Sequence, residues 1–266
     1  MPPKLFIMLA HHNWPQPNPV MVNMLLGLQQ RGFQLDIGIA AHSQLSIPLK
    51  PQHDLYILKS RSPFWLHVAA LLDQQGATIV DSYASRLLLR NKALTMQRLQ
   101  TANLPTPRTW LVGHPAQLTA LAAAHPLILK PVYGEKGASI HIVPNPGELT
   151  SLPDFAEPMM VQEYLPHEPE DVKVYVIGEH LFAFRKAFNA QSYRQAGQPF
   201  SLPAELHHLA LACGQACEVT LYGVDMILTS QGAVVVDVNW FPSYRTVPKA
   251  SDLLVEHITQ QIKKRA

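Results

Sequence analysis

The sequence predicts an α/β protein in three successive parts: a small parallel α/β domain over residues 1–88 and two α+β units over residues 89–165 and 166–266. Two observations predict this order. Apolar strands alternate with helical segments up to residue 81, which is the βαβ pattern of a parallel sheet. Beyond residue 90 the pattern changes to strands and helices in mixed α+β order. A chain of 266 residues can bury the core that such an arrangement requires.

The first part is expected to form a sheet whose ligands bind beyond the C-terminal ends of its strands. Its expected elements are strands at 4–10, 33–40, 54–59 and 77–81 and helices at 19–31 and 63–75. His11, His12, Asn13 and Lys59 lie at such strand ends, and this position makes them candidates for contacting an acceptor substrate.

The second and third parts are expected to be compact α+β units without an internal repeat. The second has expected helices at 91–102 and 115–124 and strands at 108–112, 127–130, 139–143 and 159–165. The third has expected strands at 171–178 and 180–188, joined at Gly178-Glu179, then a helix at 203–219, a β-hairpin and a helix at 250–264.

That C-terminal hairpin is the most informative segment. Two β-branched, apolar runs flank an expected three-residue loop, 230–232, which contains a glycine. Such a loop pairs Thr229 with Ala233, and counting outward places Asp225 opposite Asp237. Two facing carboxylates at the usual cross-strand separation, about 5 Å, repel each other. The conflict disappears if a cation lies between them.

Asn239 lies two residues beyond Asp237, so its side chain points to the same face of the strand. Two carboxylates and an amide form an all-oxygen set that suits Mg²⁺, which keeps its other positions for water and substrate phosphates. The alternative is a pair of solvated aspartates on an edge strand. The apolar neighbours of both aspartates argue against it, because charged groups on a buried strand pair rarely lack a partner.

Composition limits the possible partners. Charged residues make up 15% of the chain and the net charge is +2, so nucleic acid and anionic membranes are not expected partners. Cys213 and Cys217 provide no disulfide framework, which fits a reducing compartment. With no apolar run of membrane-spanning length and no signal peptide, we expect a cytoplasmic protein. No feature of the sequence indicates an oligomeric state.

A buried strand and a glycine-containing loop are candidates for binding phosphate. Lys130 ends the apolar strand 127–130, where its ammonium group is costly unless it meets an anion. The following loop contains Gly134, Lys136 and Gly137 and can turn backbone N–H groups toward phosphate oxygens. A surface hairpin is the alternative for this loop, because it matches no established phosphate-binding motif.

Further charged residues lie on the two long strands of the third part. Asp171 and Lys173 share one face of the alternating strand 171–178. Arg185 and Lys186 lie near the end of the return strand. Each of them alone is a common surface charge, so the order in which these segments follow one another carries the argument.

That order resembles the ATP-grasp superfamily over about residues 54–260. The segments are Asn91-Lys92 at a helix start, Ile128-Leu-Lys130, the glycine loop, Val161-Gln-Glu-Tyr164, Asp171-Val-Lys173-Val-Tyr-Val-Ile-Gly178, Gly223-Val-Asp225 and Asp237-Val-Asn239. Two branches are similar: RimK-type carboxylate–amine ligases and ATP-grasp inositol polyphosphate kinases. The resemblance implies that the second part is a lid subdomain, that the third carries the metal site, and that the two sandwich ATP.

The resemblance also implies cofactors and residue roles. The cofactors are ATP and Mg²⁺, or Mn²⁺ in its place. Lysines would touch the phosphates, Glu163 to Leu165 would hold adenine, and Asp171 would lie by the ribose. The implied ATP contacts are Lys92, Lys130, Gly134, Lys136, Gly137, Glu163, Tyr164, Leu165 and Asp171. The implied catalytic residues are Lys173, Arg185, Lys186 and Arg194, and the metal ligands are Asp225, Asp237 and Asn239.

We expect a RimK-like ligase, which phosphorylates a small-molecule or peptide carboxylate and lets an amine attack the acyl phosphate. A kinase acting on a hydroxyl of an inositol phosphate or similar polyol is the alternative. Lys173, Asp237 and the segment 241–244 favour the kinase, because the ligases usually have Arg, often Glu and often Pro-Gly at these places. Against it, a highly phosphorylated substrate needs a dense basic patch. In positions where such a substrate is expected to bind, the N-terminal region offers only Lys59, Arg61, Arg86 and Arg90.

A third interpretation is a non-catalytic ATP-binding scaffold. The intact set of Asp225, Asp237 and Asn239 argues against it. The acceptor cannot be named from the sequence, and ligation is the more common activity in the superfamily. The sequence therefore predicts a ligase that uses ATP and magnesium.

Overall fold

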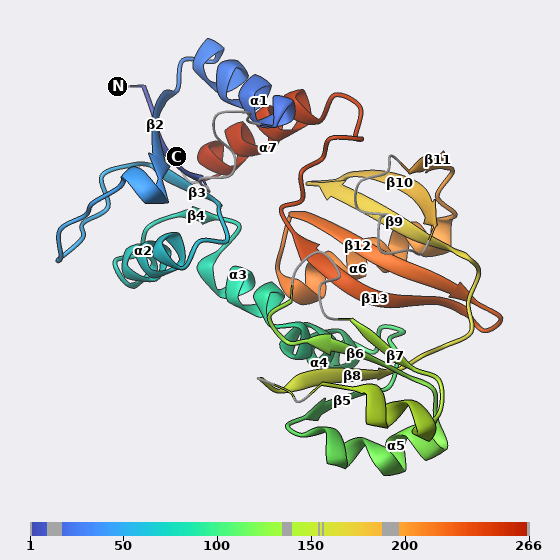
Figure 1. Cartoon of the computed structure of the whole chain (residues 1–266). Coiled ribbons are helices and arrows are strands. Elements are labelled where there is room, and N and C mark those ends of the chain that lie inside the picture. The colour runs from blue at the N-terminus through green and yellow to red at the C-terminus, as the bar shows by residue number, and fades with distance from the viewer. Residues whose placement is uncertain are drawn as a thin grey trace.

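The computed structural model describes residues 2–9, 18–134, 140–153, 155, 157–187 and 197–264, and these form three sheets with flanking helices (Figure 1). The first sheet is parallel, with strand order β2-β1-β3-β4. Its strands are β1 (Lys4–Leu9), β2 (Gln34–Ile39), β3 (Leu55–Lys59) and β4 (Ile79–Val80), and its helices are α1 (Pro19–Gln30) and α2 (Pro63–Gln74). The expected parallel sheet is confirmed, although β4 is shorter than expected.

Two helices lead from this sheet to the rest of the molecule. The first, α3 (Tyr83–Arg90), was not predicted, and its N-terminus is capped by the Ser82 side chain. The second, α4 (Lys92–Thr101), is capped by Asn91, whose side-chain oxygen accepts a hydrogen bond from Leu94 N at 3.1 Å. Lys92 is therefore the first helical residue of α4 and follows the extended residue that separates the two helices.

The central sheet is antiparallel, with order β5-β8-β6-β7. Its strands are β5 (Thr109–Val112), β6 (Leu127–Pro131), β7 (His141–Val143) and β8 (Met159–Glu163). The expected helix at 115–124 is instead a 3₁₀ turn, Pro115–Leu118, followed by α5 (Thr119–Ala124). A small core separate from the main one supports this unit: Val112, Leu118, Ala122, Leu127, Leu129, Val143, Met159 and Val161.

The third sheet is also antiparallel, with order β11-β10-β9-β12-β13. Its strands are β9 (Glu170–Ile177), β10 (His180–Ala187), β11 (Gln198–Phe200), β12 (Leu221–Thr229) and β13 (Gly232–Trp240), with helices α6 (Ala204–Cys217) and α7 (Ala250–Lys263). Strand β11 was not predicted. The expected alternation of β9 is confirmed: Val172, Val174 and Val176 are fully buried on the face opposite Lys173.

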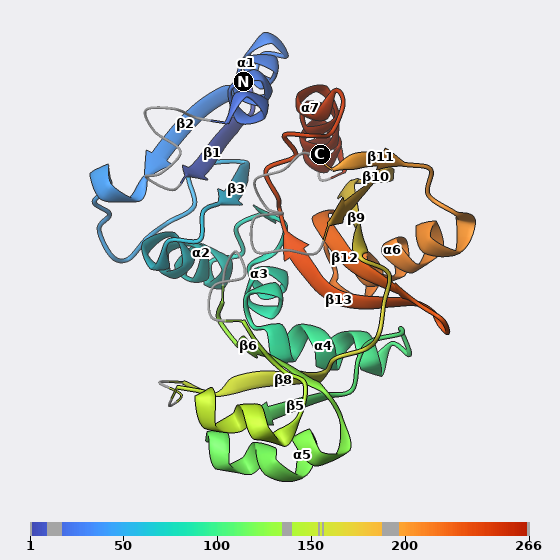
Figure 2. The same cartoon turned by 45° about the vertical axis from the view of Figure 1, so that its right-hand side comes forward.

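The chain returns at its end to the first domain. Helix α7 packs against α1 (Figures 1 and 2), and a Cβ atom on Gly27 would lie 2.9 Å from Val255 Cγ2. Glycine at this position therefore permits the close approach of the two helices. The first and third sheets share one continuous core, whereas the central unit has its own. Within the described ranges, no helix is both long and apolar enough to cross a membrane.

The predicted loop of the C-terminal hairpin is wrong by one residue, yet the predicted carboxylate pair is correct. Thr229 pairs with Gly232, so the loop has two residues instead of three. A register shift between Asp225 and Met226 leaves Val236 as an extra residue on β13. This bulge compensates for the shorter loop, and Asp225 therefore lies opposite Asp237.

Candidate functional site

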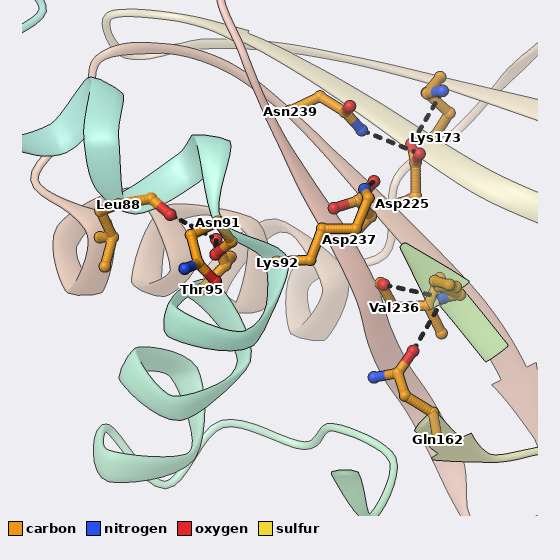
Figure 3. Close-up of polar contacts among 11 residues, drawn as sticks. Leu88, Asn91, Lys92, Thr95, Gln162, Lys173, Asp225, Val236, Asp237 and Asn239 are labelled. Atoms are coloured by element: carbon orange, nitrogen blue, oxygen red, sulfur yellow. Dashed lines mark hydrogen bonds and ion pairs between the residues drawn. The ribbon is translucent and has the colours of Figure 1, made fainter. Parts of the chain in front are cut away.

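The two facing carboxylates of the hairpin form the centre of the candidate site (Figure 3). Asp225 on β12 and Asp237 on β13 are cross-strand neighbours, and both side chains are half-buried. Asn239 extends from β13 to the same place and donates a hydrogen bond from Nδ2 to Asp225 Oδ2 at 3.1 Å. The structure therefore brings all three predicted metal ligands together.

Two lysines from different elements pair with these carboxylates (Figure 3). Lys92, at the start of α4, places Nζ 2.7 Å from Asp237 Oδ2. Lys173, on β9 next to β12, places Nζ 3.0 Å from Asp225 Oδ1. Each ammonium group thus supplies the positive charge that a facing carboxylate pair requires, in a place where a metal ion and phosphates would otherwise meet.

A third lysine reaches the same place from the central sheet. Lys130, on β6, donates from Nζ to Gln162 Oε1 at 2.8 Å and to the Val236 carbonyl at 3.4 Å. Gln162 is fully buried, and its Nε2 also donates to Thr109 Oγ1 at 3.2 Å. The bulge residue Val236 therefore links the hairpin to the lysine of the neighbouring sheet.

The charges of this cluster shift its pKa values in opposite directions. Burial alone would raise the pKa of Asp237, but the positive charges of Lys92, Lys130 and Lys173 hold it below its ordinary value. The charge of Asp225 is the main reason that the pKa of Lys173 is raised. Burial lowers the pKa of Lys130 to about 8. Lys130, Lys173 and Asp237 are therefore predominantly charged at neutral pH.

The residues of the hairpin fit a magnesium ion. Within the part of the chain that the structure describes, no group of three His, Cys, Asp or Glu residues could hold a metal. Beside Asp225 and Asp237, the side chain of Asn239 is in place to provide a further oxygen. Carboxylate and amide oxygens without thiolate or imidazole suit Mg²⁺ and disfavour zinc.

Asp171 lies beside the cluster, and one of its buried oxygens, Oδ1, lacks a hydrogen-bond donor among the described residues. Burial, followed by the charge of Asp225, raises the pKa of Asp171 to about 6. Buried carboxylate oxygens normally accept a hydrogen bond, so this atom is suited to a ligand hydroxyl.

The central sheet presents an apolar surface next to Lys130 that we did not predict from the sequence. The strand registers place Leu111, Ile128, Ile142 and Met160 on the same face as Lys130. Leu111 is 64% exposed and Ile142 is 44% exposed, on the two edge strands of the sheet. The opposite face packs into the small core. An aromatic ring placed on this surface would cover apolar area that is otherwise exposed to water.

Several predicted residues have other positions. Arg185 pairs with Glu168 at 3.1 Å and stacks on Phe200, on the face of β10 opposite Lys186. The structure therefore does not bring Arg185 to the cluster. Lys186 lies opposite Asp171 on the site face, and burial lowers its pKa.

The remaining predicted contacts lie in the loops around the site. The Glu163 side chain lies near His125, with 3.5 Å between His125 Nδ1 and Glu163 Oε1. Tyr164 and Leu165 lie in the connection from β8 to β9, and Gly134 directly follows the turn after β6. The other predicted residues lie outside the described ranges: His11, His12, Asn13, Lys136, Gly137 and Arg194.

Known proteins share both the family pattern and the fold. A model described as the RimK-like ATP-grasp domain matches residues 89–262. A probable α-L-glutamate ligase of Histophilus somni is 25% identical over 255 residues, covering 85% of this chain and 85% of that protein.

Two solved structures have the same arrangement of elements. A RimK domain ATP-grasp protein from Sphaerobacter thermophilus superposes with a TM-score of 0.74 at 20% identity, covering 96% of this chain and 99% of the other. The ATP-grasp ligase PsnB, complexed with the precursor peptide PsnA2 and AMPPNP, superposes with a TM-score of 0.70 at 18% identity, covering 97% of this chain and 96% of the other. The expected three-sheet architecture is confirmed.

Proposed function

The chain belongs to the RimK-like ATP-grasp domain family of ATP-dependent carboxylate–amine ligases, and from that premise we propose that it joins an amino acid of the glutamate type to a carboxylate-bearing small molecule or peptide. The prediction of ligase rather than kinase chemistry is confirmed at the level of the family. The cluster of Lys92, Lys130 and Lys173 around the facing carboxylates of the hairpin is the observation that carries the proposal.

This cluster holds two kinds of group that phosphoryl transfer from ATP requires: oxygen ligands for a metal ion and cations for the phosphates. Asp225, Asp237 and Asn239 would hold Mg²⁺, which when bound neutralises charge on the phosphates. Lys92 and Lys130 would exchange their present partners for phosphate oxygens. In the structure Lys92 Nζ lies against Asp237 and Lys130 Nζ against Gln162, so both ammonium groups are already at the hairpin.

The apolar face of the central sheet would hold the adenine ring, with the backbone of residues 163–165 at its edge. Leu111 and Ile142 provide apolar surface on the same face as Lys130. The free oxygen of Asp171 would accept a hydrogen bond from a ribose hydroxyl. The nucleotide would then extend from the central sheet to the hairpin.

The reaction follows from this placement. A carboxylate oxygen of the substrate attacks the γ-phosphorus, the bond to ADP breaks, and an acyl phosphate forms. The amine then attacks the carbonyl carbon, and inorganic phosphate leaves. Lys173 and Lys186 lie on the site face of the third sheet, where their charges would stabilise the oxygens of the transferred phosphoryl group. We expect Arg194 to add to this charge.

Trapping of the acyl phosphate tests the proposal. The protein is supplied with Mg-ATP, candidate carboxylates including glutamate and γ-glutamyl peptides, and hydroxylamine in place of the amine. Hydroxamate should form with the original protein and with Asp73→Asn, an exposed control on α2, but not with Asp237→Asn. Phosphate transfer to a polyol without hydroxamate would support the kinase, and nucleotide binding without any turnover would support a scaffold.

A further inference from the structure

Tyr133 is a largely exposed aromatic residue close to the candidate site, and the reaction proposed above does not use it. Its side chain is 57% exposed. It lies in the turn that follows β6, and a hydrogen bond from Gly134 N to Pro131 O at 3.2 Å closes this turn. A Cβ atom on Gly134 would lie 3.3 Å from Pro131 O, so glycine permits the turn to be tight. The end of β6 and this turn therefore define where Tyr133 lies.

The turn is joined to the junction of α3 and α4 by three contacts. Lys92 N donates a hydrogen bond to Val132 O at 3.1 Å. Asn91 Nδ2 donates a hydrogen bond to Tyr133 Oη at 3.4 Å. Arg90 Cζ lies 5.6 Å from the centroid of the Tyr133 ring, which is within the range of a cation–π contact. One backbone contact and two side-chain contacts thus link segments that are distant in the sequence.

The side chain of Asn91 is oriented by the helix that it caps. Its Oδ1 accepts a hydrogen bond from Leu94 N at 3.1 Å, and Asn91 and Lys92 lie together at the start of α4 (Figure 3). Because the amide oxygen is bound to the helix, the amide nitrogen is left to donate to Tyr133 Oη. The cap that begins α4 therefore also connects the start of this helix to Tyr133.

The connection joins two elements that each carry a lysine of the candidate site. Lys92 is the first residue of α4, and Lys130 lies on β6, three residues before Tyr133. Lys92 Nζ lies against Asp237, and Lys130 Nζ donates to Val236 O. The small core of the central sheet is separate from the core that includes α4, so contacts between the two units determine how far apart the lysines lie. The contacts of Tyr133 are placed where they can set this distance.

The residue types suit a contact that persists near solvent. An arginine guanidinium is a planar, weakly hydrated cation that stacks on aromatic faces. A tyrosine ring attracts the cation through its face, and its hydroxyl can accept a hydrogen bond as well. Leucine at position 133 would keep apolar bulk but lose both interactions, whereas phenylalanine would keep the ring face. The two contacts of Tyr133 can therefore be removed separately.

We propose that Tyr133 is a positioning residue which, by holding Arg90 and Asn91, keeps Lys92 and Lys130 at a separation that one triphosphate can bridge. Tyr133 does not touch the nucleotide in this role. It acts through Lys92, whose backbone N–H and helix cap are joined to the same turn. This inference rests on the proposed function, because it requires nucleotide phosphates at both lysines.

Calorimetric titration with Mg-AMPPNP in a double-mutant cycle tests the proposal. Tyr133→Leu should weaken binding about two- to fivefold, the range expected when a cation–π contact at an exposed position is lost. The double variant with Arg90→Gln should bind no more weakly than Tyr133→Leu alone, because both changes remove the same contact. Tyr133→Phe, which keeps the ring over Arg90, should bind within about twofold of the original protein. Leu94→Ala, a 46% exposed residue of α4, is the control and should bind as the original protein does.

A second cycle with Lys92→Met separates a positioning role from a merely structural one. In the Lys92→Met background, Tyr133→Leu should have no further effect, because the group that Tyr133 positions is gone. An undiminished effect in that background would overturn the proposal, since a general loss of structure would weaken binding in both backgrounds. Effects of Tyr133→Leu and Arg90→Gln that add would also overturn it, because the ring would then contact the nucleotide itself.

The outcomes also separate this proposal from the function on which it rests. Failure of the original protein to bind Mg-AMPPNP would contradict both the function and the role of Tyr133. Normal binding by the original protein, together with unchanged affinity in Tyr133→Leu, would overturn the role of Tyr133 alone.

Discussion

Replacing Asp237 by asparagine should separate nucleotide binding from magnesium binding. In the structure Asp237 Oδ2 holds Lys92 Nζ at 2.7 Å, and the two side chains are 23% and 19% exposed. ATP must break this ion pair before its phosphates can take the lysine. Asp237→Asn removes the competing carboxylate, so Lys92 can bind a phosphate without the free energy needed to break an ion pair.

The size of the effect follows from the exposure of the pair. Measured ion pairs near a surface contribute up to about 1 kcal/mol, and this one lies at the less exposed end of that class. Metal-free ATP should therefore bind Asp237→Asn about fivefold more tightly than the original protein. Loss of a negative charge beside the triphosphate acts in the same direction. In this variant Mg²⁺ should no longer increase the affinity for ATP, because one of the two carboxylate ligands is gone.

Calorimetric titration with ATP in EDTA, repeated in excess Mg²⁺, measures both effects. Asp73→Asn is the control and should match the original protein in both conditions. Weaker binding of metal-free ATP to Asp237→Asn would show that Lys92 does not exchange Asp237 for phosphate. An undiminished response of that variant to Mg²⁺ would refute the assignment of the metal ligand.

Three further predictions concern stability and nucleotide binding. His257 is buried against Thr220 Oγ1 at 2.8 Å, and burial lowers its pKa to about 4 from 6.5. Because the unfolded chain binds the extra proton between these values, stability is full above pH 6.5 and falls by up to about 3 kcal/mol as the pH drops to 4. Urea unfolding at both pH values should show that His257→Gln removes this loss, and an identical pH dependence in the variant would contradict it. Leu111→Ser should raise the Kd for Mg-ATP about fivefold, because apolar cover of adenine is lost. It should change the unfolding free energy by less than about 0.5 kcal/mol, since the side chain is 64% exposed; a normal Kd would refute the proposed adenine surface. Lys130→Met should raise that Kd about 10- to 100-fold by removing a charged phosphate contact, and fluorescence titration giving an unchanged Kd would remove Lys130 from the site.

The hairpin shows how far the sequence can be interpreted and where the interpretation ends. Strand alternation and a glycine turn predicted the hairpin and the facing pair of Asp225 and Asp237. The loop length was wrong because a two-residue and a three-residue turn have similar sequences, and a bulge at Val236 cannot be seen in an unbroken run of valines. The pairing was correct because the bulge and the shorter loop cancel.

The alternation rule also explains a prediction that the structure does not support. Arg185 and Lys186 are adjacent on β10, so their side chains must point to opposite faces. Only Lys186 lies on the face of Asp171 and Lys173. Their positive charge suggested both residues as site residues, whereas the register of the sheet places only Lys186 on the site face.

Three other features of the structure depend on tertiary packing, and the sequence contains no clear pattern that predicts them. The short edge strands that carry Leu111 and Ile142 have apolar residues on both faces, so periodicity does not separate the core side from the exposed side. The helix α3 has eight residues, and only the cap at Ser82 marks its start. The stacking of Arg86 on Trp240 joins residues 154 positions apart in the chain, as their numbers show, and no local pattern predicts it.

Transfer of oxygen from substrate to phosphate is the most direct test of a carboxylate activated through an acyl phosphate. A carboxylate substrate that supports hydroxamate formation is labelled with ¹⁸O in both oxygens and incubated with Mg-ATP and an amine. Mass spectrometry should find one ¹⁸O atom in each molecule of inorganic phosphate and one in the amide product. Phosphate without label, formed in step with amide, would mean that the carboxylate never received the γ-phosphoryl group.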